Sequence, residues 1–493
     1  MPSSIPPVLA AATRIAREFD YPASEVRRGV KEFINQMHEG LSKEGATLNQ
    51  IPSYITAVPD GSEKGLYLAV DLGGTNSRVC SIELHGDSTF ALTQNKVAIP
   101  RELMVCTSSK LFIFIAGQIE AFLEQHHNEH FEAHVLKRRL AGTREEYKDE
   151  EVFDLGFTFS FPVNQVGINR GTLIRWTKGF SIPDAVGKDV CELLQTAIDD
   201  LDLPVRVSAL VNDTVGTLMA RSYTAPGKTE TLLGAIFGTG TNGAYVEKLS
   251  NITKIADLTD TRYAIPTGKM VINTEWGSFD NHLNVLPTTT FDRELDVETV
   301  NPGIQMFEKR VSGMFLGEIL RRSILSLFCD PTAKLFQSAG GSIAPDSALY
   351  KLWGIDTSFL SLVEADVTPD LRVIADSLRK DFNIDGASAI DCQSVKVLVH
   401  AIGKRAARLS AVPVGAILLE SGKLETEDVV DIGVDGSLVE YYPNFQGYIR
   451  EALRDIPEIG EAGEKKVQIG IAKDGSGVGA ALSALVARKE ESS

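Results

Sequence analysis

The chain has 493 residues, more than one hydrophobic core usually serves, so we expect two domains. Apolar residues make up 43% of it and charged residues 23%, a composition typical of soluble globular proteins. The net charge of −17 argues against a surface that binds nucleic acid or anionic membranes, and any site for an anionic substrate must gather its positive potential locally.

The first third of the chain predicts helix, then strands, then helix. Residues 8–45 have apolar positions spaced as on one helix face, and residues 67–84 are typical of a strand, a glycine turn and a second strand. Residues 110–140 predict a helix whose later part is charged and rich in histidine. Pairs of histidines four residues apart can hold a metal ion, but no cysteine accompanies them, and we interpret them as a solvated helix face. The four are His126, His127, His130 and His134.

A β-α-β unit follows. Residues 153–160 alternate as a strand, residues 183–201 carry apolar side chains along one helix face, and residues 205–213 form another strand. A further helix is expected over residues 214–223. Because strands joined through a helix run parallel, at least part of one sheet should be parallel.

The second half of the chain mixes long helices with glycine-rich turns. Residues 304–328 predict a pair of amphipathic helices, and residues 395–419 begin as a helix. Residues 429–442 predict a strand, a glycine turn and a second strand. The last segment, residues 466–489, predicts a strand, a glycine loop and a helix.

Two glycine turns share the tripeptide Gly-Thr-Asn, in LAVDLGGTNSRV (68–79) and GAIFGTGTNGAYV (234–246). Glycine allows positive φ and close approach of the backbone, and successive N–H groups in such turns form a concavity for anions. Between them, Asn212 and Asp213 end a third apolar run. Two anion-binding turns and a carboxylate indicate phosphoryl transfer. With a third glycine hairpin at 430–442, the turns would also form a weak internal repeat, consistent with duplicated halves.

Three other glycine patterns match nucleotide-binding motifs and are rejected. Residues 238–243 fit GxGxxG, but a strand follows instead of the helix that a dinucleotide fold needs. Residues 475–480 open a helix but leave no room for the second strand and its ribose-binding acid. Residues 227–229 resemble the end of a Walker A loop, but Ser222 stands at its first glycine and a helix precedes it.

Six short motifs follow one another in the chain: FTFSFP (157–162), RWTKGF (175–180), VNDT (211–214), GTGTN (238–242), NTEWG (273–277) and PGIQMFEK (302–309). In this order they resemble the hexokinase/glucokinase family of ATP-dependent sugar kinases, most of all the single-unit fungal glucokinases, over nearly the whole chain. The resemblance implies an α/β protein with the two-domain actin-like ATPase fold and a cleft that closes on the sugar to exclude water. It places a small domain at 66–208, with the C-terminal helix 479–493 returning to it, and a large domain at 1–65 and 209–478.

The resemblance also implies the reaction, in which ATP phosphorylates the 6-hydroxyl of D-glucose as the first step of glycolysis. Asp213 would be the general base, with a helix N-cap as its structural alternative. Lys178 would hold the sugar and the transferred phosphoryl group, with a surface lysine as the alternative. Amides and carboxylates suit a sugar because each buried hydroxyl needs a donor or acceptor. The sugar-contacting positions would be Ser160, Phe161, Thr177, Lys178, Asn212, Asp213, Asn242, Glu275, Gln305 and Glu308.

On the nucleotide side, DLGGTN would be the first phosphate loop, GTGTN the second, and GVDGS (433–437) with AKDGSG (472–477) the adenosine side. The residues that would bind ATP are Asp71, Gly73, Gly74, Thr75, Asn76, Arg78, Gly238, Thr239, Gly240, Gly436, Ser437, Lys473, Gly475 and Ser476. Asp71 suits a place beside phosphates only if Mg²⁺ stands between them, held through water, because a bare carboxylate would repel ATP. Many hexokinases have an aromatic residue where this chain has Ser77.

Other functions stay open. A broad-specificity hexokinase acting also on fructose and mannose would use the same hydroxyl contacts. A non-catalytic sugar-sensing regulator would not need Asp213, and an actin-like or chaperone-like ATPase would not need the sugar contacts. Five dispersed cysteines without a CxxC pair, and an N-terminus unlike a signal peptide, favour the cytoplasm. We expect a monomer or weak homodimer, with no nucleic-acid or membrane partner.

Overall fold

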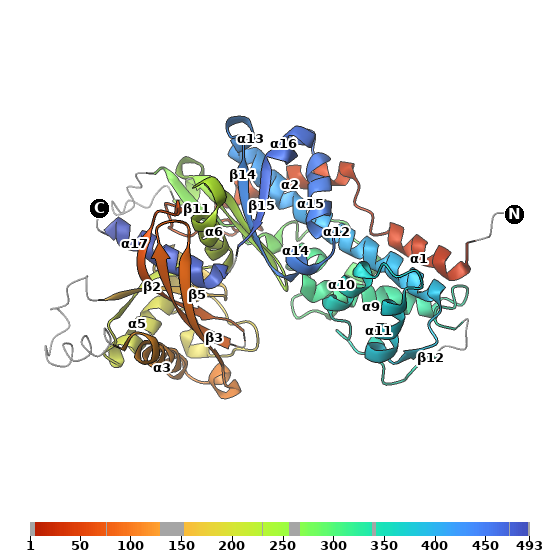
Figure 1. Cartoon of the computed structure of the whole chain (residues 1–493), viewed down its shortest axis with the longest axis horizontal. Helices are drawn as coiled ribbons and strands as arrows, with labels where there is room; N and C mark the ends of the chain where they lie inside the picture. Colours follow the sequence, from red (N-terminus) through yellow and green to blue (C-terminus); the bar gives the residue numbers. More distant parts are fainter. Residues whose placement is uncertain are drawn as a thin grey trace.

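The computed structural model describes residues 5–74, 76–128, 152–228, 230–255, 267–337, 342–472 and 474–491. The described strands form one sheet of five strands, one of six, and two small sheets of two strands each. Figure 1 shows the two large sheets side by side, with helices on their faces and a mainly helical region at the end that carries the N-terminus. The predicted α/β class is confirmed.

The five-stranded sheet contains, in spatial order, β4 (Phe90–Ala98), β3 (Asn76–His85), β2 (Lys64–Leu72), β5 (Phe153–Phe159) and β8 (Val205–Val211). Strands β2 and β3 form the predicted antiparallel hairpin, and β2, β5 and β8 are parallel, as the β-α-β pattern predicts. Helices α3 (Ser108–His126) and α5 (Val190–Asp200) pack on one face and α17 (Gly475–Glu491) on the other. A Cβ atom on Gly156 would lie 2.0 Å from the Ala480 carbonyl oxygen, so glycine lets α17 approach β5 this closely.

The six-stranded sheet contains, in spatial order, β1 (Ile51–Pro52), β11 (Lys269–Asn273), β10 (Thr241–Lys248), β9 (Thr231–Phe237), β14 (Val430–Asp435) and β15 (Val467–Ile471). Strands β9 and β10 form the second predicted hairpin, and β9, β14 and β15 are parallel. Helix α6 (Asp213–Thr224) packs on β9, β10 and β14 and also against α17. It therefore lies between the two sheets and connects them.

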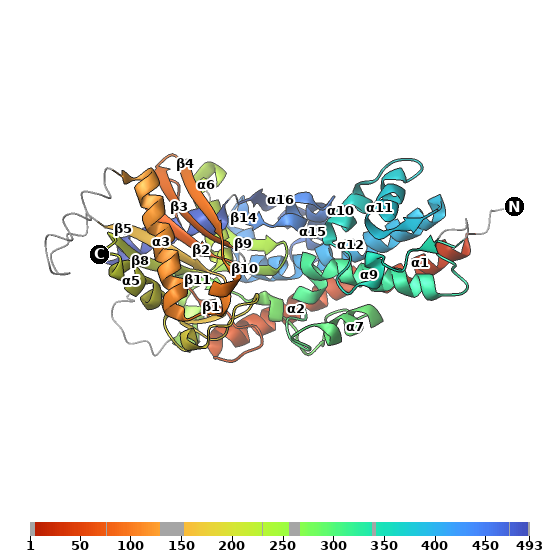
Figure 2. The ribbon, with the colours of Figure 1, turned by 90° about the horizontal axis from the view of Figure 1, so that it is seen from below.

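The helical region is built around α12 (Ala389–Ser421), a 33-residue helix that continues through Pro413. It packs against α1 (Pro7–Arg17), α2 (Ala23–Ser42) and α15 (Phe445–Arg454). Figure 2 shows α1 and α2 following each other along one side of the molecule. The remaining α-helices of the described residues are α7 (Thr290–Glu298), α8 (Glu308–Val311), α9 (Gly313–Cys329), α10 (Thr357–Ala365), α11 (Arg372–Phe382), α13 (Lys423–Thr426), α14 (Ser437–Tyr441) and α16 (Gly460–Lys466).

Some predicted elements were wrong. The chain over 429–442 forms β14 and then the helix α14 in place of a second strand, because Gly436 (φ +112°) turns the chain and α14 buries Leu438 and Val439. The third hairpin of the proposed repeat is therefore absent from this described segment.

Two predicted helices begin or break elsewhere. Residues 8–45 form two helices, and residues 18–22 separate them. The helix predicted from 183 begins at Val190, because the Asp189 side chain caps it by accepting from the backbone N–H groups of Cys191 and Glu192.

The predicted histidine-rich helix ends at His126. His126 lies 3.3 Å from the side chain of Asn95, and His127 lies 2.9 Å from the hydroxyl of Ser81. His130 and His134 lie outside the described residues. Among the residues that the model describes, no group of three or more His, Cys, Asp or Glu side chains is arranged to hold a metal ion.

Candidate active site

Asp213 lies at the first residue of α6, directly after β8. The N-cap of α6 is its neighbour Asn212, whose side chain accepts from the Thr214 backbone N–H at 2.9 Å and from the Thr214 hydroxyl at 2.6 Å. The N-cap role considered as the alternative for Asp213 is thus taken by Asn212, although the Asp213 carboxylate also accepts a hydrogen bond from the Thr214 N–H at 2.9 Å. Because β2, β5 and β8 are parallel, their carboxyl ends bring Asp71, Ser160 and Asp213 to one edge of the sheet.

The electrostatic environment of Asp213 suits a group that takes a proton near neutral pH. Burial raises the pKa of Asp213 from its ordinary 3.8 to about 6. The Lys178 cation lowers this pKa, while the Glu275 and Asp71 carboxylates raise it. Residues from three separate motifs therefore act on one carboxyl group, as expected for residues that share a site.

The segment 160–180 forms one wall. The Lys178 ammonium donates to the Ser160 carbonyl at 2.7 Å and lies 5.3 Å from the centre of the Phe161 ring. Phe161 in turn packs edge-on against Trp176 and Phe180. Lys178 has a left-handed backbone (φ +57°) and its side chain is exposed, next to the half-buried Thr177. Backbone strain of this kind gathers at functional sites.

The opposite wall comes from β10, the segment after β11, and the start of α8. Glu275 (φ +53°) accepts at one oxygen, Oε1, from Asn273 at 2.8 Å and from Asn242 at 3.3 Å. Burial raises the pKa of Glu275, and these two hydrogen bonds and Arg175 oppose the rise. No hydrogen bond to its second oxygen is found among the described residues, which suits a contact with a ligand hydroxyl.

Two further residues of this wall lie on the segment that enters α8. Glu308 accepts from the Thr241 backbone N–H at 3.0 Å, and burial raises its pKa, with Glu275 and Asp213 adding to the rise. Gln305 also has a left-handed backbone (φ +59°). Its side-chain oxygen is buried against Gly277 and has no hydrogen-bond partner among the described residues. An unsatisfied acceptor at this place suits a hydroxyl donor.

Asn242 is bonded mainly to protein. Its amide nitrogen donates to Asn273 at 2.8 Å and to Glu275, while its oxygen accepts from Thr274 and from the Gly243 and Trp276 backbones. In this arrangement Asn242 orients Glu275 in addition to any sugar contact. Sequence reasoning missed Asn273, which is buried at the end of β11. The sequence feature that could have identified Asn273 is its position in the NTEWG motif, two residues before Glu275.

The first glycine turn opens onto a pocket of about 570 Å³ lined by Asp71, Gly73, Gly74, Asn76, Arg78, Gln94 and Lys96. A Cβ atom on Gly74 would lie 3.1 Å from the Lys178 side chain, so this turn adjoins the wall formed by residues 160–180. Thr75 lies outside the described residues. Sequence reasoning missed Gln94 and Lys96. They come from the edge strand β4, where Lys96 pairs in register with Arg78.

Arg78 connects this turn to the C-terminal segment. It pairs with Asp71 at 3.5 Å and Asp474 at 3.3 Å, and it bonds to the Ser476 hydroxyl. The Ser476 carbonyl accepts from Thr158 at 2.7 Å. Ser476 therefore lies beside the first phosphate turn, and Gly475 lies against α6. Lys473 lies outside the described residues.

The second glycine turn meets two other segments. Its Gly238 N–H donates to the Gly240 carbonyl at 3.0 Å, and the Gly238 and Thr239 carbonyls accept from Gly313 and Met314 at 2.7 and 3.1 Å. A Cβ atom on Gly436 would lie 2.5 Å from the Phe237 carbonyl, which places the turn before Ser437 directly against this hairpin. Sequence reasoning missed the contact with residues 312–314, because only the tertiary structure brings α9 to this turn.

A buried carboxylate between a wall of amides and carboxylates and two phosphate-type glycine turns defines a kinase that phosphorylates a hydroxyl group. Family models described as hexokinase match residues 11–223 and 232–486. The chain therefore belongs to the hexokinase family, and it is an ATP-dependent sugar kinase.

Individual relatives agree with this assignment. The chain is 65% identical to a glucokinase of Aspergillus niger over 488 residues, 98% of each chain. It is 42% identical to glucokinase-1 of Saccharomyces cerevisiae over 97% of each chain. Among solved structures it resembles a hexokinase from Schistosoma mansoni complexed with glucose, with a TM-score of 0.76 and 33% identity over 97% of this chain and 98% of that one. A second hexokinase structure matches with a TM-score of 0.79 and 28% identity, over 97% and 99% of the two chains. The predicted actin-like sugar kinase fold is confirmed.

Proposed function

We propose that this sugar kinase transfers the γ-phosphoryl group of ATP to the 6-hydroxyl of D-glucose. The observation that carries the proposal is the buried Asp213 carboxyl, which has a pKa of about 6 and lies near Lys178 and Glu275, from the two walls of the site, and near Asp71 of the first phosphate turn. A general base works best when its pKa lies near the working pH. The names of two relatives, glucokinase of Aspergillus niger and glucokinase-1 of Saccharomyces cerevisiae, support glucose as the substrate.

In this mechanism Asp213 accepts the proton of the sugar hydroxyl as the oxygen attacks phosphorus. Lys178 offsets negative charge on the transferred group, and the position of its side chain beside Gly74 of the first phosphate turn supports that role. Glu275 and Glu308 accept hydrogen bonds from sugar hydroxyls, and the unsatisfied oxygen of Gln305 supports a hydroxyl contact there as well. The other proposed sugar contacts are Ser160, Phe161 (by its backbone), Thr177, Asn212 and Asn242.

The nucleotide is proposed to lie across both glycine turns. Gly73, Gly74, Asn76 and Arg78 would meet phosphate on one side, with Thr75, Gly475, Ser476 and Lys473, and Gly238, Thr239, Gly240, Gly436 and Ser437 on the other. Mg²⁺ would be held by the ATP phosphates and, through water, by Asp71, whose carboxylate lines the phosphate pocket. When bound, the ion offsets the charge on the phosphates.

We also propose the domain division 66–208 with 479–493 against 1–65 with 209–478. The packing of α17 on β2, β5 and β8 supports the return of the C-terminal helix to the small domain. The exposure of Lys178 supports closure, because a lysine that holds a phosphoryl group in the reacting state should be shielded from water. No described helix is long and apolar enough to cross a bilayer. We propose a cytoplasmic monomer or weak homodimer.

A coupled assay of ADP release tests the function. Wild-type protein and Asp213→Asn would be assayed with glucose, fructose and mannose. We expect turnover with glucose, and a loss of at least about 10² in kcat for the variant, since general-base catalysis contributes about 10²–10⁴. Similar kcat/KM values for all three sugars would favour the broad-specificity alternative, and a variant that kept more than a tenth of the turnover would remove Asp213 as the base.

A further inference from the structure

A second pocket, of about 670 Å³, lies between α1, the segment that joins α1 to α2, and the middle of α12. None of its lining residues belongs to the candidate active site. The sugar kinase activity assigns it no role. Pockets of roughly 300–1,000 Å³ are the usual size for small-molecule ligands.

The lining of this pocket is strongly cationic. Lys396, His400, Lys404 and Arg408 follow one another at four-residue spacing along α12, so they form one stripe on that helix. Arg405, next to the stripe, and Arg17, from α1, add two further cations, and Asp20 is the single acid among the lining residues. This is a local positive field in a chain whose net charge is −17.

Several of these cations have acidic neighbours outside the lining. Arg408 donates to the Tyr21 carbonyl and pairs with Asp455, and His400 lies 2.9 Å from Glu364. Lys404 pairs with Glu451 at 3.4 Å, with the two side chains 38% and 44% exposed. Because exposed ion pairs contribute little to stability, Lys404 can exchange Glu451 for a ligand at small cost.

Arg17 is exposed and has no ion-pair partner among the described residues. It faces the pocket from α1, whereas Lys404 faces it from α12. Two cations on opposite walls are therefore available to an anion. The apolar side chains of Phe19, Val397 and Ala401 line the same pocket and suit a carbon skeleton.

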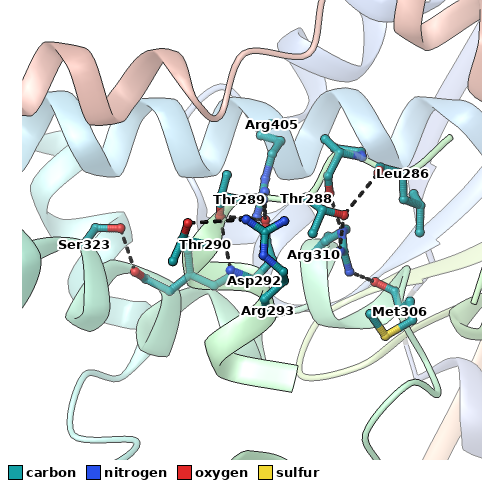
Figure 3. A network of polar contacts seen from close by, with 12 residues as sticks. Leu286, Thr288, Thr289, Thr290, Asp292, Arg293, Met306, Arg310, Ser323 and Arg405 are labelled. Carbon is teal, nitrogen blue, oxygen red and sulfur yellow. Dashed lines mark hydrogen bonds and ion pairs between the residues drawn. The ribbon is translucent and has the colours of Figure 1, made fainter. Parts of the chain in front are cut away.

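Two buried arginines, Arg405 of the pocket lining and Arg310, lie near the carboxylate of Asp292 (Figure 3). Arg405 donates to both oxygens of Asp292 at 2.7 and 2.8 Å, and its guanidinium lies 4.8 Å from the centre of the Phe19 ring. Arg310 donates instead to neutral groups, among them the Met306 carbonyl at 2.7 Å. Asp292 pairs with Arg405, and Asp292, Asp296 and Asp280 all act electrostatically on Arg310, so the cluster is a set of compensated buried charges.

The same cluster contacts the segment of the candidate active site that carries Gln305 and Glu308. The Met306 carbonyl, which Arg310 binds, follows Gln305 directly and lies two residues before Glu308. Arg310 also donates to the Pro287 carbonyl at 2.6 Å and the Thr288 hydroxyl at 2.9 Å, just before Thr289, the N-cap of α7, whose capping box Asp292 completes. A continuous set of polar contacts and packed charges thus joins the floor of the pocket to the segment that carries Gln305 and Glu308.

We propose that this pocket binds a small multivalent anion, a phosphate ester or a polycarboxylate, and that binding there changes the affinity of the enzyme for its sugar. Arg17 and Lys404 would contact the anion directly, and Arg405 and Arg408, which also line the pocket, would add to its positive field. The sugar effect rests on the proposed function, whereas the anion site does not.

Calorimetric titration tests the site. Wild-type protein, its active site filled with glucose and a non-hydrolysable MgATP analogue, would be titrated with fructose 1,6-bisphosphate and, separately, with tricarballylate. We expect at least one of them to bind, which tells phosphate from carboxylate recognition, and Arg17→Ala/Lys404→Ala to weaken that binding at least about tenfold. Arg27→Ala/Lys465→Ala removes the same charge from exposed positions outside the pocket and should bind normally. Absence of binding by wild type, or equal binding by all three proteins, would overturn the site.

The glucose KM tests the effect on the sugar. With the anion that binds, KM should change by at least about threefold in wild type and in the control variant, and not in the pocket variant. Glucose should change the anion affinity by the same factor, since coupling between two binding sites is reciprocal. Binding without a change in KM would refute the effect on the sugar while leaving the anion site, and all three proteins should keep their basal kcat.

Discussion

The acid limb of the pH profile should report the titration of Asp213. With a pKa of about 6, this carboxyl is ionised to about 90% at pH 7 and to about 9% at pH 5. Because only the ionised form accepts a proton, kcat/KM for glucose should fall about tenfold per pH unit below pH 6. Glu275 and Glu308 face the same cleft with raised pKa values, so their protonation would steepen the fall.

A charge-removing variant identifies the titrating group. Lys178 lowers the pKa of Asp213, so Lys178→Met should move the acid limb to higher pH while also reducing kcat. Lys188→Met removes the same charge from an exposed position outside the candidate site, serves as the control and should leave the limb in place. The assay is initial-rate kinetics from pH 5 to 9 at saturating MgATP. A profile that stays flat to pH 5, or a limb that Lys178→Met moves to lower pH, would refute this assignment.

Four further outcomes are expected. The pKa of Asp213 is higher in the folded protein than its ordinary 3.8, so the ionised carboxylate destabilises the fold above that pH. Asp213→Asn should therefore raise the free energy of unfolding at pH 7 by at most about 3 kcal/mol. Denaturant titrations should show this gain vanishing below pH 4. Glu275→Gln and Glu308→Gln should each raise the glucose KM roughly 10- to 150-fold and the ATP KM less than about threefold, and the reverse order would remove that residue from the sugar site. Saturating glucose should reduce the radius of gyration in solution scattering, and an unchanged profile with sugar bound would contradict closure. Asp292→Asn should cost about 3–5 kcal/mol in urea unfolding because Arg405 stays buried without a counter-ion; a loss below 1 kcal/mol would show that water reaches it.

Local patterns predicted much of the fold. The hairpins around the two Gly-Thr-Asn turns, the parallel arrangement of β5 and β8, and the strand, loop and helix at the C-terminus all depend on neighbouring residues, and the structure has each of them. The segment after β14 was predicted wrongly as a strand, because a short apolar run after a glycine suits a short helix equally well once Leu438 and Val439 are buried. The long helix α12 keeps Pro413 inside it because packing on several sides outweighs the local penalty.

The candidate site, like the fold, could be predicted only in part from the sequence. The order of the motifs along the chain, through its resemblance to the hexokinase family, proposed Asp213, Lys178, Glu275 and Glu308 as site residues, and their side chains suit hydroxyl and phosphate chemistry. Which of them act on one another depended on contacts between segments far apart in the chain: the pKa of Asp213 rises because the folded chain buries it near Glu275 and Asp71. The bonds that Asn273 makes to Asn242 and Glu275, and the approach of Gly313 to the second turn, join β10, β11 and α9 across the large sheet. The cationic pocket on α12 could not be predicted from the sequence either. Its basic residues line a pocket only because α1 and the segment after it pack against α12 in the folded chain. Burial and long-range contact set the strength of every charge, and both arise only when the chain is folded.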